Sequence, residues 1–217
     1  MNHDRIAPVY DLLARLWTGG GILRASTVIA DHVRPGHRVL MAGVGGGRDA
    51  AVLAGRGAQL TLVDLSSRML DRAATRVFEA TPGAQLRMVQ GDALTADLPP
   101  HDVVCAHYFL NLWDLRGAAE ALRALRRHLV QGGLISIADF RPLPPRAGLL
   151  QRVHYAVPAK VFSALGLCAP HPVHDYAPLL APLGLQPLRT RDVPVFGWGP
   201  RWHRAWIARA EASPSPP

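Results

Sequence analysis

A cluster of glycines behind a short apolar run is the first feature of this chain that indicates chemistry. The apolar residues 39–42 precede an expected helix from Arg48, and four glycines lie between them: Gly43, Gly45, Gly46 and Gly47. Glycine lets the backbone turn sharply, and it lets a ligand lie against the main chain beside the free N–H groups of a helix start. One glycine would suffice for a turn, so this spacing favours a ligand-binding turn over a purely structural one.

Two ligand classes use such a strand, turn and helix. Residues 45–50 match the loose dinucleotide pattern G-x-G-x-x-A, and Asp64 follows about 20 residues on. However, Asp49 lies in the first turn of the expected helix, where a carboxylate satisfies the positive helix end and repels a pyrophosphate. A ligand without phosphates therefore fits this turn better.

Two further carboxylates follow predicted strands. Asp64 ends the strand at 59–63, where it can accept both hydroxyl protons of a ribose, chemistry that dinucleotides share with S-adenosylmethionine. The alternative is that Asp64 caps the next helix, for which Ser66 is the expected N-cap. Asp92 follows the strand at 86–90 and is placed to accept from an adenine amino group.

His107 is the candidate general base. It leaves a predicted strand at 102–106, at the carboxyl edge where open α/β sheets bind ligands. The alternatives are a histidine that is hydrogen-bonded within its loop and one that only lines the cofactor.

Alternating strands and helices predict an α/β fold with a mainly parallel sheet. We expect further helices at 5–18, 22–34, 115–130 and 175–184, and further strands at 134–139, 185–193 and 203–210. Prolines after Arg141 mark a linker to a helical lid at 147–167, broken near Pro158. One domain then spans 1–211, and 212–217 form a disordered tail.

Composition agrees with one soluble, cytoplasmic enzyme domain. The chain has 217 residues, 49% of them apolar, and no apolar run reaches the roughly 18 residues of a transmembrane helix. No secretory signal is evident, and Cys105 and Cys168 suggest buried, reduced thiols without a disulfide framework. No metal site is expected, because the ligand-rich segment 171–175 lacks a matching distant pair.

The net charge of +8 does not by itself indicate a nucleic-acid partner. Basic residues are scattered, and the few aromatic residues do not alternate with arginines as a stacking platform requires. A solvated basic face is the favoured interpretation, and peripheral contact with anionic lipid stays an open alternative.

With these motifs in order, the chain resembles the class I S-adenosylmethionine-dependent methyltransferases over roughly residues 5–140. The matching segments are 43–47, 63–66 with Met69 and Leu70, 91–93, and 129–134. The resemblance implies a Rossmann-like seven-stranded sheet with helices on both faces. It also implies a set of residues that contact S-adenosylmethionine: Gly43, Gly45, Asp64, Met69, Asp92 and Ala93.

The N-terminal residues 6–13 are similar to the opening helix of the ubiquinone/menaquinone C-methyltransferase group. That similarity implies that Tyr10 closes over the cofactor. One position departs from the family pattern: an acid that helps to hold the methionine end of the cofactor is replaced by Met41. A thioether accepts hydrogen bonds only weakly, so Asp49, Tyr10 or water must substitute, or affinity falls.

The sequence therefore predicts S-adenosylmethionine-dependent methyl transfer to a small aromatic or quinone-like acceptor, at carbon or oxygen. Two alternatives remain. A non-catalytic methyltransferase-like binding or scaffold protein would explain Met41. An NAD-dependent oxidoreductase would explain the glycine turn and Asp64, but not the segment 91–93 or Asp49.

Overall fold

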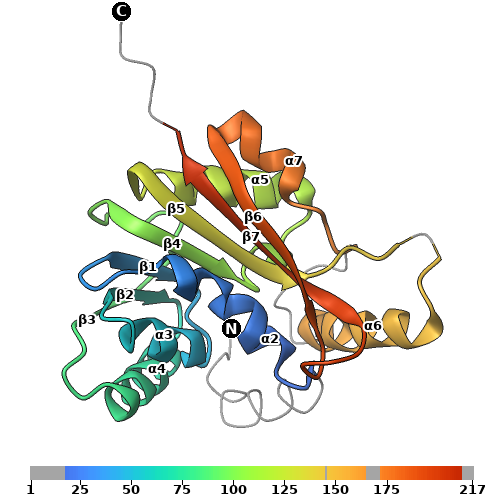
Figure 1. Cartoon of the computed structure of the whole chain (residues 1–217), viewed down its shortest axis with the longest axis horizontal. Helices are drawn as coiled ribbons and strands as arrows, with labels where there is room; N and C mark the ends of the chain where they lie inside the picture. The colour runs from blue at the N-terminus through green and yellow to red at the C-terminus, as the bar shows by residue number, and fades with distance from the viewer. Residues whose placement is uncertain (1–17, 145, 165–171, 212–217) are drawn as a thin grey trace, which may run out of the picture.

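A twisted seven-stranded sheet forms the centre of the computed structural model, which describes residues 18–144, 146–164 and 172–211 (Figure 1). The strand order is β3-β2-β1-β4-β5-β7-β6; β1 to β5 run parallel, and β7 lies antiparallel to β5 and β6. The strands are β1 (Arg38–Ala42), β2 (Gln59–Asp64), β3 (Leu86–Gln90), β4 (His101–His107), β5 (Leu129–Phe140), β6 (Leu185–Pro194) and β7 (Arg201–Ala210). The predicted fold class is confirmed.

Helices cover both faces of the sheet (Figure 1). One face carries α2 (Gly21–Ser26), η2 (Thr27–His32), α3 (Arg48–Ala54) and α4 (Ser67–Ala80). The other carries η3 (Leu110–Leu112), α5 (Leu115–Arg126), α7 (Ala177–Leu180) and η4 (Ala181–Leu183), while α6 (Leu149–Ala164) lies beside the sheet.

Side-chain alternation along the strands divides the core into two layers. On β1, Val39 and Met41 pack into the cluster beneath α2, α3 and α4, whereas Leu40 and Ala42 pack into the cluster beneath α5. The nearly uninterrupted apolar run of β1 follows from this position, because a central parallel strand is buried on both faces.

Several predicted elements differ in the structure, among them the helix expected at 175–184, which is divided into α7 and η4. The helix expected at 22–34 changes from α2 to the tighter turns of η2 at Thr27. The helix expected at 115–130 ends at Arg126, and the residues from Leu129 start β5, because Leu129 pairs with His101 of β4. Sheet pairing thus overrides the helical periodicity of this segment.

The expected break of the lid helix near Pro158 is also wrong. Helix α6 runs from Leu149 to Ala164, since a proline removes one backbone donor and not the whole hydrogen-bond ladder. Tyr10, Cys168, nearly all of the expected helix 5–18 and the tail 212–217 lie outside the described residues.

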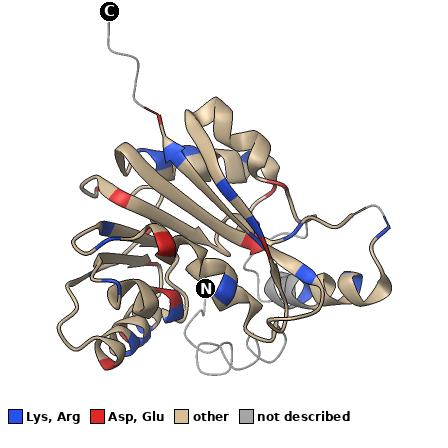
Figure 2. Cartoon of the chain, viewed as in Figure 1, with Lys and Arg blue, Asp and Glu red and all other residues tan. Residues whose placement is uncertain are grey.

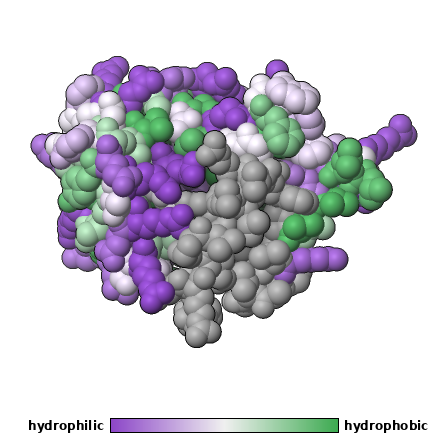
Figure 3. Space-filling view, turned by 90° about the horizontal axis from the view of Figure 1, so that it is seen from below, coloured by the Kyte–Doolittle hydropathy of each residue, from purple (hydrophilic) through white to green (hydrophobic). Residues whose placement is uncertain are grey.

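Charged residues are spread over many elements of the fold. Figure 2 shows that lysine and arginine residues occur on several helices and strands. Viewed from below, hydrophobic residues gather at the right-hand rim, the side on which Figure 1 places the start of α6 (Figure 3). The first two residues of this helix, Leu149 and Leu150, are exposed. Within the described ranges, no helix has both the length and the apolar character that a membrane crossing requires.

Candidate cofactor site

The glycine turn between β1 and α3 has the geometry that its sequence predicted. Gly43, Gly45 and Gly47 adopt φ angles of 67°, 52° and 69°, in the left-handed region that favours glycine. A Cβ at Gly43 would lie 2.6 Å from the Phe109 ring, and one at Gly47 would lie 2.4 Å from Cβ of Ala73. A Cβ at Gly45 would meet nothing within 4 Å. Packing therefore requires the outer two glycines, while Gly45 leaves open space beside the backbone.

That open space is part of a cleft of about 680 Å³ at the carboxyl ends of β1 and β4. β1 and β4 lie side by side in the sheet, with β2 on the outer side of β1 and β5 on the outer side of β4. The strand order therefore reverses between β1 and β4, and the cleft lies at this topological switch point, where open α/β sheets bind ligands. Its volume is in the range of small-molecule sites. The lining comprises residues 18–20, Ile22, Leu23, Arg24, Ser26, the glycine turn with Arg48 and Asp49, His107, Tyr108 and Phe196.

Asp64 connects the end of β2 to the glycine turn. Its Oδ1 accepts from the backbone N–H of Ser66 at 2.9 Å, and its Oδ2 accepts from that of Gly45 at 3.4 Å. The carboxylate is half-buried beside the cleft. Both sequence-based interpretations of Asp64 therefore remain compatible with its position, because it supports the start of α4 and also faces the turn.

Like Asp64, the predicted cofactor contacts Met69, Asp92 and Ala93 lie outside this cleft lining. Met69 is half-buried in the first turn of α4, where its N–H donates to Oγ of Ser66 at 3.3 Å. Oδ1 of Asp92 accepts from the N–H of Leu94 at 2.9 Å, and Ala93 is buried in the core beneath α5. Local turn geometry accounts for these three residues, so their contact with a cofactor stays a prediction.

His107 lies at the centre of a buried hydrogen-bonded row. Its Nδ1 is 2.6 Å from Oδ2 of Asp49, and its Nε2 is 3.0 Å from Oγ of Ser136. The His107 side chain is only 5% exposed. Helix α3 contributes Asp49, β4 contributes His107 and β5 contributes Ser136, so the row joins three elements.

This row argues against the base role that the position of His107 suggested. An ionised Asp49 requires the Nδ1 proton; Nε2 then accepts from the Ser136 hydroxyl in the neutral ring, or donates to it in the charged ring. In either state both nitrogens are engaged, and no lone pair faces an acceptor molecule. The order Asp-His-Ser also resembles a hydrolytic triad, but Ser136 is fully buried within β5 and inaccessible to a substrate.

Tyr108, which follows His107, has the one positive φ among described residues other than glycine, at 51°. Its N–H donates to the carbonyl of Ala138 at 2.7 Å, and its hydroxyl lies 2.6 Å from Nδ1 of His203. Burial, followed by the nearby charges of His154 and Arg24, lowers the pKa of His203 to about 3. A strained residue held by two such contacts at a cleft is typical of a functional site.

Several cleft residues could not be found from the sequence. Arg24 of α2 donates through Nη2 to the carbonyls of Gly19 and Pro194, both at 3.0 Å, and so ties the cleft wall to β6. Phe196 reaches the cleft from the turn between β6 and β7. No motif marks these residues, since only the three-dimensional packing brings them beside the glycine turn.

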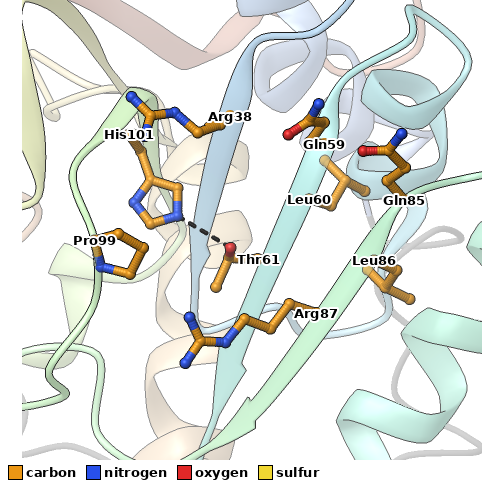
Figure 4. A pocket seen from close by; sticks show the side chains of 9 residues that line it. All are labelled: Arg38, Gln59, Leu60, Thr61, Gln85, Leu86, Arg87, Pro99 and His101. Atoms are coloured by element: carbon orange, nitrogen blue, oxygen red, sulfur yellow. Dashed lines mark hydrogen bonds between the residues drawn. The ribbon is translucent and has the colours of Figure 1, made fainter.

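A second, shallower pocket lies at the opposite, amino edge of the sheet and is shown in Figure 4. There Nε2 of His101 is 3.0 Å from Oγ1 of Thr61, between Arg38 and Arg87. Burial, followed by the charge of Arg38, lowers the pKa of His101 to about 4. This contact ties β4 to β2 far from the glycine turn. Searched over the described residues, no group of histidine, cysteine or acidic side chains has the arrangement of a metal site.

Comparison with known proteins agrees with the geometry. A family model described as "Methyltransferase domain" matches residues 39–133. The ubiquinone/menaquinone biosynthesis C-methyltransferase UbiE of Pseudomonas paraeruginosa is 25% identical over 187 residues, which are 84% of this chain and 72% of that protein.

Solved structures share the fold. Magnesium protoporphyrin IX methyltransferase from Synechocystis, with bound S-adenosylhomocysteine, superposes with a TM-score of 0.66 at 20% identity over 91% of this chain and 85% of that one. The 1,6-didemethyltoxoflavin-N1-methyltransferase from Burkholderia thailandensis superposes with a TM-score of 0.63 at 20% identity over 98% of this chain and 91% of that one.

Proposed function

Because the chain belongs to the class I S-adenosylmethionine-dependent methyltransferases, we propose that it methylates a small aromatic or quinone-like acceptor, at a carbon or an oxygen atom. The observation that carries the proposal is the cleft at the switch point of the sheet. The open side of Gly45 faces it, Asp49 lines it, and Asp64 contacts the glycine turn beside it. Its wall combines aliphatic and aromatic side chains with Arg24 and Arg48.

The cleft fits the cofactor chemically. S-adenosylmethionine has a ribose diol and an ammonium group, for which the carboxylates of Asp64 and Asp49 are suitable acceptors. It also has a carboxylate of its own, which suits the arginines of the cleft lining, Arg24 and Arg48. Asp64 is the residue for the ribose hydroxyls, and Gly45 lets the cofactor approach the backbone. When bound, the cofactor supplies an electrophilic methyl group on a positively charged sulfur.

The chain itself contributes alignment and exclusion of water. Holding an acceptor in line with the methyl carbon at near-attack distance supplies much of the rate enhancement, and a closed site limits side reactions. The walls available for this purpose are Ile22 and Leu23 of α2, Tyr108 and Phe196. Flat apolar acceptors pack well against such walls, because aromatic rings stack or meet edge to face.

The acceptor class has a second support in the relatives. The curated proteins similar to this chain are named as ubiquinone/menaquinone biosynthesis C-methyltransferases, and a structural neighbour has bound 1,6-didemethyltoxoflavin. These names indicate ring-shaped acceptors in related proteins. Helix α6, in the segment predicted as a lid, is our candidate for the roof of the acceptor site.

Isothermal titration with S-adenosylmethionine, S-adenosylhomocysteine and NADH tests the cofactor class first. We expect saturable binding of the first two ligands and none of NADH. An acceptor screen with quinols, phenols and heteroaromatic rings, read by mass spectrometry with isotopically labelled cofactor, then tests transfer. Cofactor binding without turnover on any ring acceptor would favour the binding-protein alternative, and binding of NADH alone would contradict the proposal.

A further inference from the structure

The methionine end of the cofactor needs an acceptor for its ammonium group, and the end of β1 does not offer one. Met41 is 3% exposed and packs into the core beneath α2 and α3. In the sheet register Met41 lies beside Cys105, and Cys105 lies beside Ser136, so these three residues form one row on this face. A thioether, a thiol and a hydroxyl in such a row provide no anionic charge.

The negative charge on this face comes from α3 instead. Asp49 lies in the first turn of α3 and lines the cleft, with its side chain 14% exposed. Its carboxylate lies close enough to Cys105 to affect the pKa of that thiol. Burial is the main cause that raises this pKa, and the negative charge of Asp49 raises it further. Asp49 therefore supplies a carboxylate over the same part of the sheet from a different element.

His107 fixes the orientation of that carboxylate. The 2.6 Å contact engages Oδ2, while Oδ1 accepts from the N–H of Ala50 at 3.0 Å. On the other side of the imidazole ring, Nε2 lies 3.0 Å from Oγ of Ser136. A carboxylate has about four lone-pair sites, so two hydrogen bonds leave acceptor capacity directed to the cleft.

We propose that Asp49 is the residue that receives the ammonium group of the cofactor, and that His107 is its positioning residue, held in turn by Ser136. The inference rests on the proposed function, because it assigns one end of the same cofactor site. It also explains why both nitrogens of His107 are engaged by protein groups and why the loss of an acid at Met41 is tolerated. An orienting neighbour of this kind preserves the geometry of a binding group without touching the ligand.

The test compares two ligands that differ at the methionine end. S-adenosylhomocysteine has the amino-acid group, whereas 5′-methylthioadenosine has the same nucleoside and a thioether but no ammonium. For Asp49→Asn, calorimetry is expected to show an affinity loss of about tenfold to a hundredfold for S-adenosylhomocysteine and almost none for 5′-methylthioadenosine. Asp71→Asn, on the exposed side of α4, makes the same charge change away from the cleft and serves as the control.

The positioning role of His107 needs a measurement whose result a purely structural role would leave unchanged. His107→Asn keeps an N–H donor near the place of Nδ1 and is expected to retain most of the affinity for S-adenosylhomocysteine. His107→Leu is expected to lose it selectively, again without effect on 5′-methylthioadenosine. If Asp49→Asn does not fold, Asp49→Glu answers the same question, because the longer side chain displaces the carboxylate and should give the same selective loss.

These measurements distinguish a failure of this inference from a failure of the proposed function. Unchanged affinity of Asp49→Asn for S-adenosylhomocysteine, or an equal loss for both ligands, overturns the inference while the proposed function stands. Equal behaviour of His107→Asn and His107→Leu overturns the positioning role. Failure of the unchanged protein to bind either ligand overturns the proposed function and this inference with it.

Discussion

At the scale of single residues, hydrogen-bond partners separate the roles of similar side chains. Asp49 lines the cleft and Asp64 contacts the glycine turn beside it, but a histidine orients the first and two backbone N–H groups orient the second. Asp92 has the same chemistry and is engaged by the turn that follows it. The type of residue was predictable from the sequence, whereas the partner that determines its role comes from a distant segment.

Asp64→Asn is expected to weaken S-adenosylmethionine binding about tenfold, because a neutral amide accepts less strongly from ribose hydroxyls than a carboxylate does. The amide oxygen can still accept from the N–H of Ser66, so the thermal unfolding midpoint should change little. Calorimetric titration and thermal denaturation of the same preparation measure the two effects, with Asp71→Asn as the matched control. Unaltered affinity would exclude the ribose role and leave Asp64 as a support for α4.

At the scale of elements, strands and turns were more predictable than helix ends. The strand, glycine turn and helix around Gly45 follow from local chemistry, since a buried run and left-handed positions are encoded by neighbouring residues. The end of α5 and the start of β5 were not encoded locally, because Leu129 joins the sheet through its pairing with His101. In the same way, the contacts of His107 depend on α3 and β5 meeting over one strand end.

The glycine turn allows binding and stability to be separated by two alanine substitutions. Both positions have positive φ, so each substitution costs about 1–2 kcal/mol of unfolding free energy from the backbone alone. Gly47→Ala adds a clash with the Cα and Cβ of Ala73 and should be clearly the less stable variant. Gly45→Ala meets no protein atom and should instead lose cofactor affinity, because its methyl group projects into open space.

Urea denaturation and cofactor titration of the two variants provide the measurements. The reverse order, with Gly45→Ala the less stable protein and its affinity intact, would show that the cofactor does not lie against this turn.

At the scale of the whole molecule, burial decides how some histidines bind protons, which a count of residues in the sequence does not reveal. The sequence has 10 histidines, but His101, His154 and His203 are almost fully buried. Burial is the main cause that lowers the pKa of His101 and His154 to about 4 and that of His203 to about 3. Each ring stays neutral in the folded protein at a pH where it would be protonated in the unfolded chain.

The sign of the resulting pH dependence follows from proton linkage. Below the unfolded pKa of 6.5, the unfolded chain binds more protons than the folded one, so stability is complete above pH 6.5 and falls as the pH drops toward 4. Between pH 7 and pH 5 the protonation of each of these three histidines in the unfolded chain should cost on the order of 2 kcal/mol of unfolding free energy. Urea denaturation of the unchanged protein, followed by circular dichroism, should therefore show a steep loss of stability over this interval.

His101→Gln removes one of these titrating groups and keeps an amide that can bond the hydroxyl of Thr61. The variant should lose about 2 kcal/mol less than the unchanged protein between pH 7 and pH 5, because one fewer proton is taken up on unfolding. His37→Gln, at a partly exposed position just before β1, makes the same replacement of a histidine by glutamine and serves as the matched control. Parallel pH profiles for the unchanged protein and His101→Gln would show that the amino edge of the sheet admits a charged histidine, and that β4 is not tied to β2 by a neutral ring.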